Sequence, residues 1–199
     1  MAMKLSKNLC VVDVETTGPS PFVHDLLSVA FVPVMMPERA LSVFVRHSSL
    51  EWTDFGRENF KKFDQDWNQY AVAPVDACHR IESYLELLFQ GEPATLVGHN
   101  VGFDVSFLRK LALSIGKFQF SGISHRSIDT HTMLFVAAAQ GAMPRDAISS
   151  DAAFEFLGIT PPPELRHTAL GDAIATRAMF LRLLDVLDSD TTRQLRRAR

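Results

Sequence analysis

Two carboxylates stand close together near the start of the chain, in the segment LCVVDVETTGPS that runs from Leu9 to Ser20. The segment is otherwise mostly apolar, which indicates a buried strand. Successive side chains of a strand point to opposite faces, so Asp13 and Glu15 share one face. Like charges on one face repel each other and are costly to remove from water. A cation, strong hydrogen-bond donors or open water could compensate, so an ion-binding pair and a solvated edge strand both remain open.

Two further aspartates each follow a residue that can cap a helix. In GHNVGFDVSFL, Asn100 is the expected N-cap, which places Asp104 in the first helical turn. In LRHTALGDAIATR, Thr168 is the expected cap and Asp172 falls in the first turn, while His167 lies in the loop just before the helix. An acidic residue in a first turn complements the helix dipole, which is sufficient to explain either aspartate alone. The set gains chemical meaning because a strand-borne pair and two aspartates at helix starts can meet at one end of a sheet.

The elements that would position these residues follow from the apolar pattern. Three strand-like segments come first, separated by proline and glycine signals: Leu9–Glu15, Leu26–Val34 and Leu41–Arg46. Farther on, helices and short strands alternate: a helix over 75–91, the strand TLVGHN, a helix ending at Gly116, the strand RSID, and helices in THTMLFVAAAQG and SSDAAFEFLG. A final long helix is marked by Leu170, Ile174, Ala178, Leu181 and Leu184. This order predicts an α/β fold with a mixed sheet covered by helices.

Residues 55–70 carry an aromatic stripe at helical spacing, formed by Phe60, Phe63, Trp67 and Tyr70. Such a stripe is most often core packing. A platform on which bases stack, or to which a partner docks, is the second interpretation.

Composition limits the class of protein. The 199 residues suit one domain, and 47% hydrophobic residues argue against extensive disorder. A net charge of −3 excludes a polycation that coats nucleic acid, although an acidic metal site can have a local basic rim. We expect a single domain over 1–199, with a core of about 9–188 and a basic segment, 189–199, as a solvated or disordered tail.

Cellular context is also indicated. The longest apolar stretch, LLSVAFVPVMM, is too short to cross a bilayer, and no secretory leader is evident at the N-terminus. We therefore expect a cytoplasmic protein that does not enter a membrane. Cys10 and Cys78 have no metal-like spacing and are expected to be small buried hydrophobic residues.

Three segments, DVETTG, GHNVGFD and HTALGD, resemble in order and spacing the three motifs of the DEDDh (DnaQ-like) 3′–5′ exonucleases. Each motif alone is weakly specific, but the ordered set is strong, and the resemblance extends from about Leu9 to Met179. It implies an RNase H-like fold, a five-stranded mixed sheet with an antiparallel second strand, flanked by helices. It also implies five catalytic residues: Asp13, Glu15, Asp104, His167 and Asp172.

The resemblance further implies two divalent cations, and carboxylate oxygens suit Mg²⁺ or Mn²⁺. Asp13 would bridge the two ions, Glu15 and Asp172 would serve the ion on the nucleophile side, and Asp104 would act partly through water. Neutral His167 would take a proton from the attacking water. The products would be nucleoside 5′-monophosphates.

Substrate contacts are a separate set of expectations. The backbone around Thr16, Thr17 and Gly18 would approach the terminal nucleotide. Many relatives follow this glycine with a large apolar residue that wedges against the terminal base, whereas this chain has Pro19. The candidates to replace that wedge or to contact substrate are Phe22, Phe103 and Asn100, with packing the default for Phe103 and capping for Asn100. Asp129 is expected to be a strand-end cap.

These observations favour a metal-dependent 3′–5′ exonuclease that acts on single-stranded DNA or RNA. An oligoribonuclease-like enzyme restricted to short RNA is the nearest alternative, and a catalytically silent interaction module with the same fold is the alternative from another class. The full set of five residues argues against the silent module, since binding alone needs no acidic cluster. The expected partner is single-stranded nucleic acid, with a polymerase or a second copy of the chain as candidate protein partners.

Overall fold

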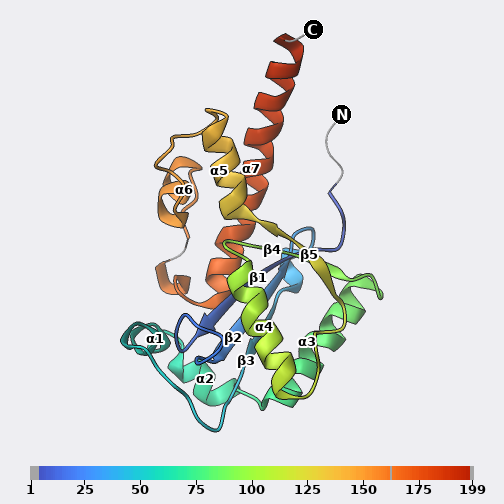
Figure 1. Ribbon diagram of the computed structural model, residues 1–199, viewed down its shortest axis with the longest axis vertical. Coiled ribbons are helices and arrows are strands. Elements are labelled where there is room, and N and C mark those ends of the chain that lie inside the picture. The colour runs from blue at the N-terminus through green and yellow to red at the C-terminus, as the bar shows by residue number, and fades with distance from the viewer. Residues whose placement is uncertain (1–4, 162, 198–199) are drawn as a thin grey trace.

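A five-stranded mixed sheet forms the centre of the molecule (Figure 1). The computed structural model describes residues 5–161 and 163–197, with side chains as far as residue 188. The strands are β1 (Leu9–Thr16), β2 (Leu26–Pro33), β3 (Leu41–Phe44), β4 (Ala94–Gly98) and β5 (Ile123–Asp129), and their order across the sheet is β3-β2-β1-β4-β5. Strand β2 runs antiparallel to β1 and β3, whereas β4 and β5 run parallel to β1. The predicted fold class, including the antiparallel second strand, is confirmed.

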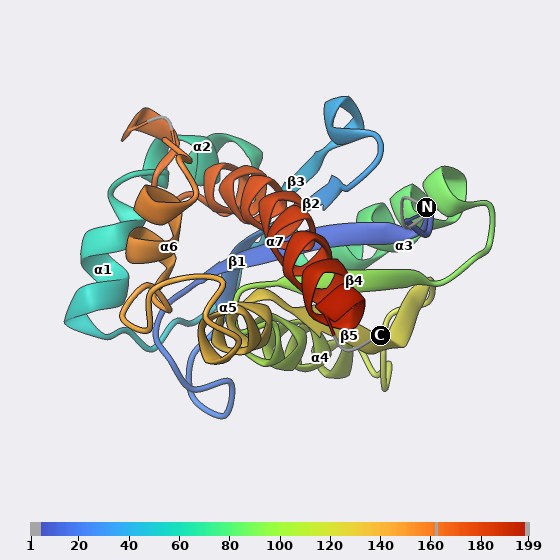
Figure 2. The same ribbon diagram turned by 90° about the horizontal axis from the view of Figure 1, so that it is seen from above.

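Helices cover both faces of the sheet. On one face, α3 (Pro74–Phe89) and α4 (Gly102–Ser114) pack against a core that includes Val12 and Phe31. On the other face, the long helix α7 (Ala169–Arg197) packs through Ala173 and Phe180 onto Val11. Figure 2 shows α7 crossing the strands. Helices α5 (Thr130–Ala139) and α6 (Ser150–Phe156) share a further apolar cluster with α7.

The aromatic segment forms two short helices, α1 (Asp54–Phe60) and α2 (Asp64–Tyr70). Phe63 and Trp67 are buried against Leu27, and the Trp67 indole donates a hydrogen bond to the Val45 carbonyl at 2.9 Å. The Phe60 ring lies edge-on to both Phe63 and Trp67, with centroids 5.3 and 5.5 Å apart. Core packing is therefore the correct interpretation for these three rings, whereas Tyr70 is exposed.

Several predicted bounds differ from the structure. Strand β5 begins at Ile123, three residues earlier than the predicted RSID, because it already pairs there with Ala94. Two single-turn 3-10 helices, η1 (Pro37–Arg39) and η2 (Pro163–Leu165), lie in connections. Helix α7 continues to Arg197, so the segment predicted as a basic tail is helical to that point, and its side chains lie outside the described residues.

Two predictions about the interior and about membranes can be compared with the structure. Cys10 and Cys78 are both buried and unpaired, as predicted. Among the described residues, no helix combines the length and apolar character needed to cross a bilayer.

Candidate active site

Three carboxylates from two distant parts of the chain meet at one end of the sheet. Ligand oxygens of Asp13, Glu15 and Asp172 all lie within 4.8 Å of one another. Val12 and Val14 pack into the core beneath α3 and α4, so Asp13 and Glu15 project from the other face, on which α7 lies. The shared face predicted from strand alternation is thus the face that Asp172 approaches.

Asp104 lies in the first turn of α4, as predicted, and is 4% exposed. Its negative charge acts on both Asp13 and Glu15. The expected cap is wrong: Asn100 adopts a left-handed conformation with φ of 61°, and the helix begins after Val101. The Asp129 carboxylate accepts the Val101 N–H at 3.0 Å and also caps α5 through Thr132, so it fixes the start of both helices.

The cluster is electrostatically unbalanced by itself. Burial, followed by the charges of Asp104, Glu15 and Asp172, raises the pKa of Asp13 well above its usual range. Burial is also the main cause that raises the pKa of Glu15 to about 8 and that of Asp104 to about 8. Clustered carboxyl groups that offer only oxygen donors, three of them with raised pKa values, fit a hard divalent cation. The residues present therefore suit the cation that the sequence resemblance implies.

His167 occupies the loop between η2 and α7, as predicted, and it is half-buried. Its φ of 59° keeps it outside the helix. Thr168 fixes the turn, because its hydroxyl donates to the Leu165 carbonyl at 2.7 Å and accepts the Gly171 N–H at 3.2 Å. The predicted capping role of Thr168 is thus present, and it orients the loop beside the first turn that carries Asp172.

A cavity of about 490 Å³ adjoins Glu15. Three of the residues predicted to contact substrate line it: Thr16, Gly18 and Phe103. The other three do not belong to its lining: the Thr17 side chain is fully buried, Phe22 is 95% exposed on a loop, and Asn100 is exposed. Pro19, at the position of the usual apolar wedge, lines the cavity.

Helix α1 supplies a wall of this cavity that sequence reasoning missed. Its lining residues include Thr53, Phe55, Gly56 and Asn59. A Cβ at Gly56 would lie 2.3 Å from the Thr17 carbonyl oxygen, so glycine lets α1 approach the loop after β1 closely. The aromatic stripe in this segment indicated packing, but no spacing linked α1 to Glu15.

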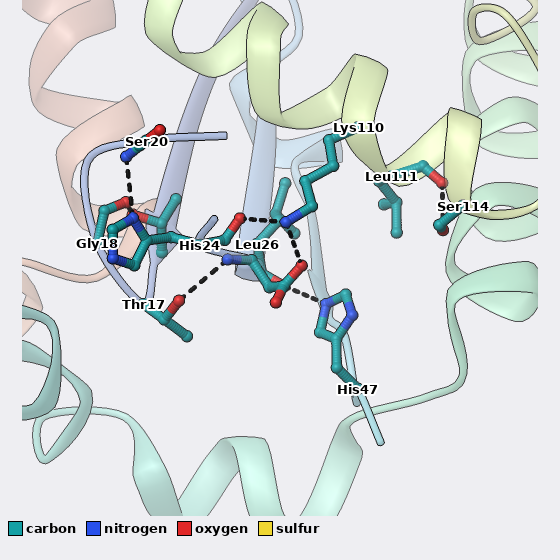
Figure 3. A network of polar contacts seen from close by, with 11 residues as sticks. Thr17, Gly18, Ser20, His24, Leu26, His47, Lys110, Leu111 and Ser114 are labelled. Atoms are coloured by element: carbon teal, nitrogen blue, oxygen red, sulfur yellow. Dashed lines mark hydrogen bonds and ion pairs between the residues drawn. The ribbon is translucent and has the colours of Figure 1, made fainter. Parts of the chain in front are cut away.

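Contacts within the loop of residues 17–25 and with helix α4 hold the loop in place (Figure 3). The Lys110 ammonium of α4 donates to the His24 carbonyl at 2.6 Å and pairs with Asp25 at 2.7 Å. The Asp25 N–H donates to the Thr17 hydroxyl at 3.0 Å. A Cβ at Gly18 would lie 2.5 Å from the His24 ring, so this glycine makes room for the histidine within the loop.

Two basic residues near the cluster were also missed. Arg166 contacts Asp172, with Nη1 to Oδ1 at 3.1 Å, and Asp151, with Nη2 to Oδ1 at 2.7 Å. The positive charge of Lys62 acts on Glu15. Arg166 directly precedes His167 in sequence, but contacts made by long side chains leave no periodic signal.

Comparison with known proteins agrees with the fold and the site. The sequence matches the exonuclease family of the RNase T type over residues 10–180. The structure is similar to the nuclease domain of 3′hExo, a DEDDh family member that was solved with bound rAMP. The TM-score is 0.71 at 18% identity, and the match covers 89% of this chain and 91% of that one. The fold and the carboxylate cluster define a nuclease-like α/β domain. The chain belongs to the exonuclease family, and the predicted membership is confirmed.

Two curated relatives differ in how much of them is matched. A DNA polymerase III subunit epsilon-like protein of Rhodobacter capsulatus is 47% identical over 96 residues, which cover 48% of this chain and 12% of the relative. The 3′–5′ DNA exonuclease Cap18 of Escherichia coli is 28% identical over 193 residues, covering 93% of this chain and 96% of the relative. The chain spans about an eighth of the polymerase-related proteins it matches.

Proposed function

We propose that this chain is a metal-dependent 3′–5′ exonuclease that hydrolyses phosphodiester bonds at the 3′ end of a single strand and releases nucleoside 5′-monophosphates. The observation that carries the proposal is the convergence of Asp13, Glu15 and Asp172 within 4.8 Å, beside a cavity of about 490 Å³. A binding module would have no use for clustered, half-buried carboxylates at the end of an apolar strand. A relative named as a 3′–5′ DNA exonuclease supports the same conclusion.

The four acids would hold two Mg²⁺ or Mn²⁺ ions, with Asp13, Glu15 and Asp172 as the central ligands and Asp104 beside them. When bound, the cations would activate water and stabilise negative charge on the phosphate. Neutral His167 would take the proton of the attacking water through its imidazole.

The cavity beside Glu15 would receive the 3′-terminal nucleoside. Phe103 and Phe55 offer apolar faces for a base, while Thr16 and Gly18 bring backbone close to the sugar. Pro19 would take part in the wedge contact, and Phe22, at the exposed tip of the loop, would meet the strand outside the cavity. Thr17 would act by holding the loop in place, and Asn100 would contact the strand from the turn before α4.

Single-stranded DNA is the favoured substrate within this proposal. Cap18, which is matched along most of its length and of this chain, is named a DNA exonuclease. Escherichia coli exonuclease I was solved with a dT13 oligonucleotide. It is a structural neighbour with a TM-score of 0.70 and 15% identity, and the match covers 86% of this chain and 40% of that one. The names of the polymerase-related relatives support a role beside a polymerase, with a second copy of this chain as the other candidate partner. We place this role in the cytoplasm.

The test is a comparison of matched substrates labelled at the 5′ end: single-stranded DNA, single-stranded RNA and dinucleotides, each with Mg²⁺ or Mn²⁺. We expect stepwise shortening from the 3′ end, with DNA the best substrate and with a 3′-phosphate or a circular strand resistant. Asp13→Asn is the inactive control. Rapid cutting of the circle would indicate an endonuclease. Folded protein without activity on any substrate would instead favour the silent module.

A further inference from the structure

Arg166 joins the acidic cluster to helix α6. One end of its guanidinium lies 3.1 Å from Asp172 Oδ1, and the other lies 2.7 Å from Asp151 Oδ1 on α6. The guanidinium carbon also stands 5.4 Å from the centroid of the Phe154 ring, one turn farther along α6. The Arg166 side chain is only 23% exposed, so these three contacts hold it in a defined place.

The two carboxylates that share Arg166 differ in environment. The Asp172 side chain is 21% exposed and belongs to the trio of ligand oxygens, whereas the Asp151 side chain is 81% exposed and stands outside that trio. The positive charge of Arg166 also reaches Asp13. A permanent cation therefore stands at the edge of the proposed metal site and is attached to one of its ligands.

A divalent cation and a guanidinium on the same carboxylate repel each other. Water screens this repulsion poorly at a site where the carboxylates are largely buried. Without the ion, Arg166 compensates part of the negative charge of the cluster. With the ion bound, repulsion between the ion and the Arg166 guanidinium lowers the affinity for the ion. The Asp151 carboxylate is a second binding partner for the guanidinium.

We propose that Arg166 is an internal counter-cation that competes with the divalent metal for Asp172 and so sets the metal affinity of the site, with Asp151 drawing it away. This inference rests on the proposed metal site. It assigns Arg166 no contact with the reacting atoms, and it assigns Asp151, an exposed residue on another helix, an effect on metal binding.

The opposite assignment, in which Arg166 only orients Asp172 for the metal, predicts the opposite sign. If Arg166 positions the ligand, its removal weakens metal binding. If Arg166 competes, its removal strengthens metal binding and destabilises the metal-free protein. The sign of the change in affinity thus separates the two roles, and the measurement needs no nucleic acid.

The experiment is isothermal titration of the metal-free full chain with Mn²⁺. Arg166→Gln should lower the Kd for Mn²⁺ by about tenfold, the effect expected when one nearby like charge is removed. Arg166→Lys, which keeps the charge, should stay near the wild type. Asp151→Asn should raise the Kd, because Arg166 then rests on Asp172 alone. Glu164→Gln removes an equal charge from the exposed 163–165 turn and is the matched control, with a smaller effect.

The double variant Arg166→Gln with Asp151→Asn completes the cycle. Once Arg166 is neutral, Asp151→Asn should change the Kd no more than Glu164→Gln does. Calorimetry should show a larger Mn²⁺-induced rise in Tm for Arg166→Gln than for the wild type, because tighter binding stabilises the folded state more. An unchanged or raised Kd in Arg166→Gln would overturn the counter-cation role while leaving the proposed function intact. A wild type that binds no Mn²⁺ at millimolar concentration would overturn both.

Discussion

The backbone of His167 lies in the turn just before helix α7. Its φ of 59° lies in the left-handed region, which is uncommon outside glycine and asparagine. Thr168 and Leu165 close the turn around it through the threonine hydroxyl. This arrangement places His167 before the helical turn that carries Asp172, and His167 does not belong to the cluster of three carboxylates. A proton acceptor and a metal ligand are therefore separable by mutation.

His167→Ala should leave folding and Mn²⁺ affinity nearly intact and lower turnover by about 10²–10⁴-fold, the usual effect of losing an acid–base group. His167→Asn should behave alike, and asparagine tolerates the left-handed backbone, which removes strain as an explanation. Asp172→Asn should instead weaken Mn²⁺ binding as well as turnover, because a charged ligand becomes a neutral amide. Turnover and calorimetric titration on the same preparations check this. Near-normal turnover in folded His167→Ala would refute the assignment of His167 as the proton acceptor. His79 is exposed on α3, so His79→Ala is the control for a histidine away from the site.

The sequence predicted individual residues to different degrees. Strand alternation was enough to place Asp13 and Glu15 on one face, because a period of two fixes the direction of each side chain. The positions of Asp104 and Asp172 at helix starts indicated that they can meet this pair at one end of a sheet, whereas their shared catalytic role was implied by the family resemblance. Arg166 was missed because its partners are brought together only by tertiary packing. Asn100 was misassigned because the Asp129 carboxylate receives the Val101 N–H in the structure.

At the scale of elements, contacts with helix α4 and with the start of helix α1 hold the 17–25 loop in its conformation. Lys110 of α4 binds it at His24 and Asp25, and Thr53 at the start of α1 donates its N–H to the Thr17 carbonyl at 3.0 Å. Both helices also contribute to the wall of the cavity. The position of Gly18 in that wall therefore depends on an ion pair that lies outside the cavity.

Lys110→Met should raise KM for a single strand several-fold, with a smaller fall in kcat, because the loop that lines the cavity loses its anchor on α4. Steady-state kinetics with a DNA oligonucleotide measures this split. The matched control is Lys117→Met, which breaks a similarly half-buried ion pair with Glu82 away from the cavity. Both variants should lose comparable stability, on the order of 1 kcal/mol. Equal KM changes in the two would show that loss of stability alone explains the effect.

The elements themselves were largely predictable, with one informative exception in α7. In α3 the predicted face carries buried Ile81 and Leu85, because the helix packs on one side only. In α7 the predicted stripe includes Ile174, which is 41% exposed, whereas Met179 and Phe180 are buried. Helix α7 packs against the sheet and against α5 and α6, so its buried arc spans two faces and the most apolar stripe does not mark it.

At the scale of the whole molecule, two apolar cores enclose the sheet, and the acidic cluster lies at one end of it. Burial raises the pKa values of the cluster, so the folded, metal-free protein keeps protons at a pH where the same carboxyl groups of the unfolded chain have lost them. Glu15 and Asp104, with pKa values near 8, and Asp13, with a raised pKa, stay protonated at a pH where the unfolded carboxyls have ionised. A bound divalent cation replaces those protons. Stability, pH and metal are therefore linked through the same three side chains.

The sign of this linkage gives the last prediction. Because the folded state binds more protons, the stability of the metal-free protein falls as pH rises from about 4.5 towards about 8, by up to roughly 1.4 kcal/mol per pH unit for each proton. His99 has a pKa lowered by burial and acts in the opposite sense, but below its ordinary value of 6.5. Calorimetry between pH 7 and 8 in EDTA should thus show a falling Tm, with Mg²⁺ raising Tm more at pH 8 than at pH 7. Glu15→Gln should flatten the metal-free slope, because an amide has no proton to lose. A metal-free Tm that rises over this interval in the wild type, with Glu15→Gln unchanged, would show that these carboxyls are already ionised in the folded protein.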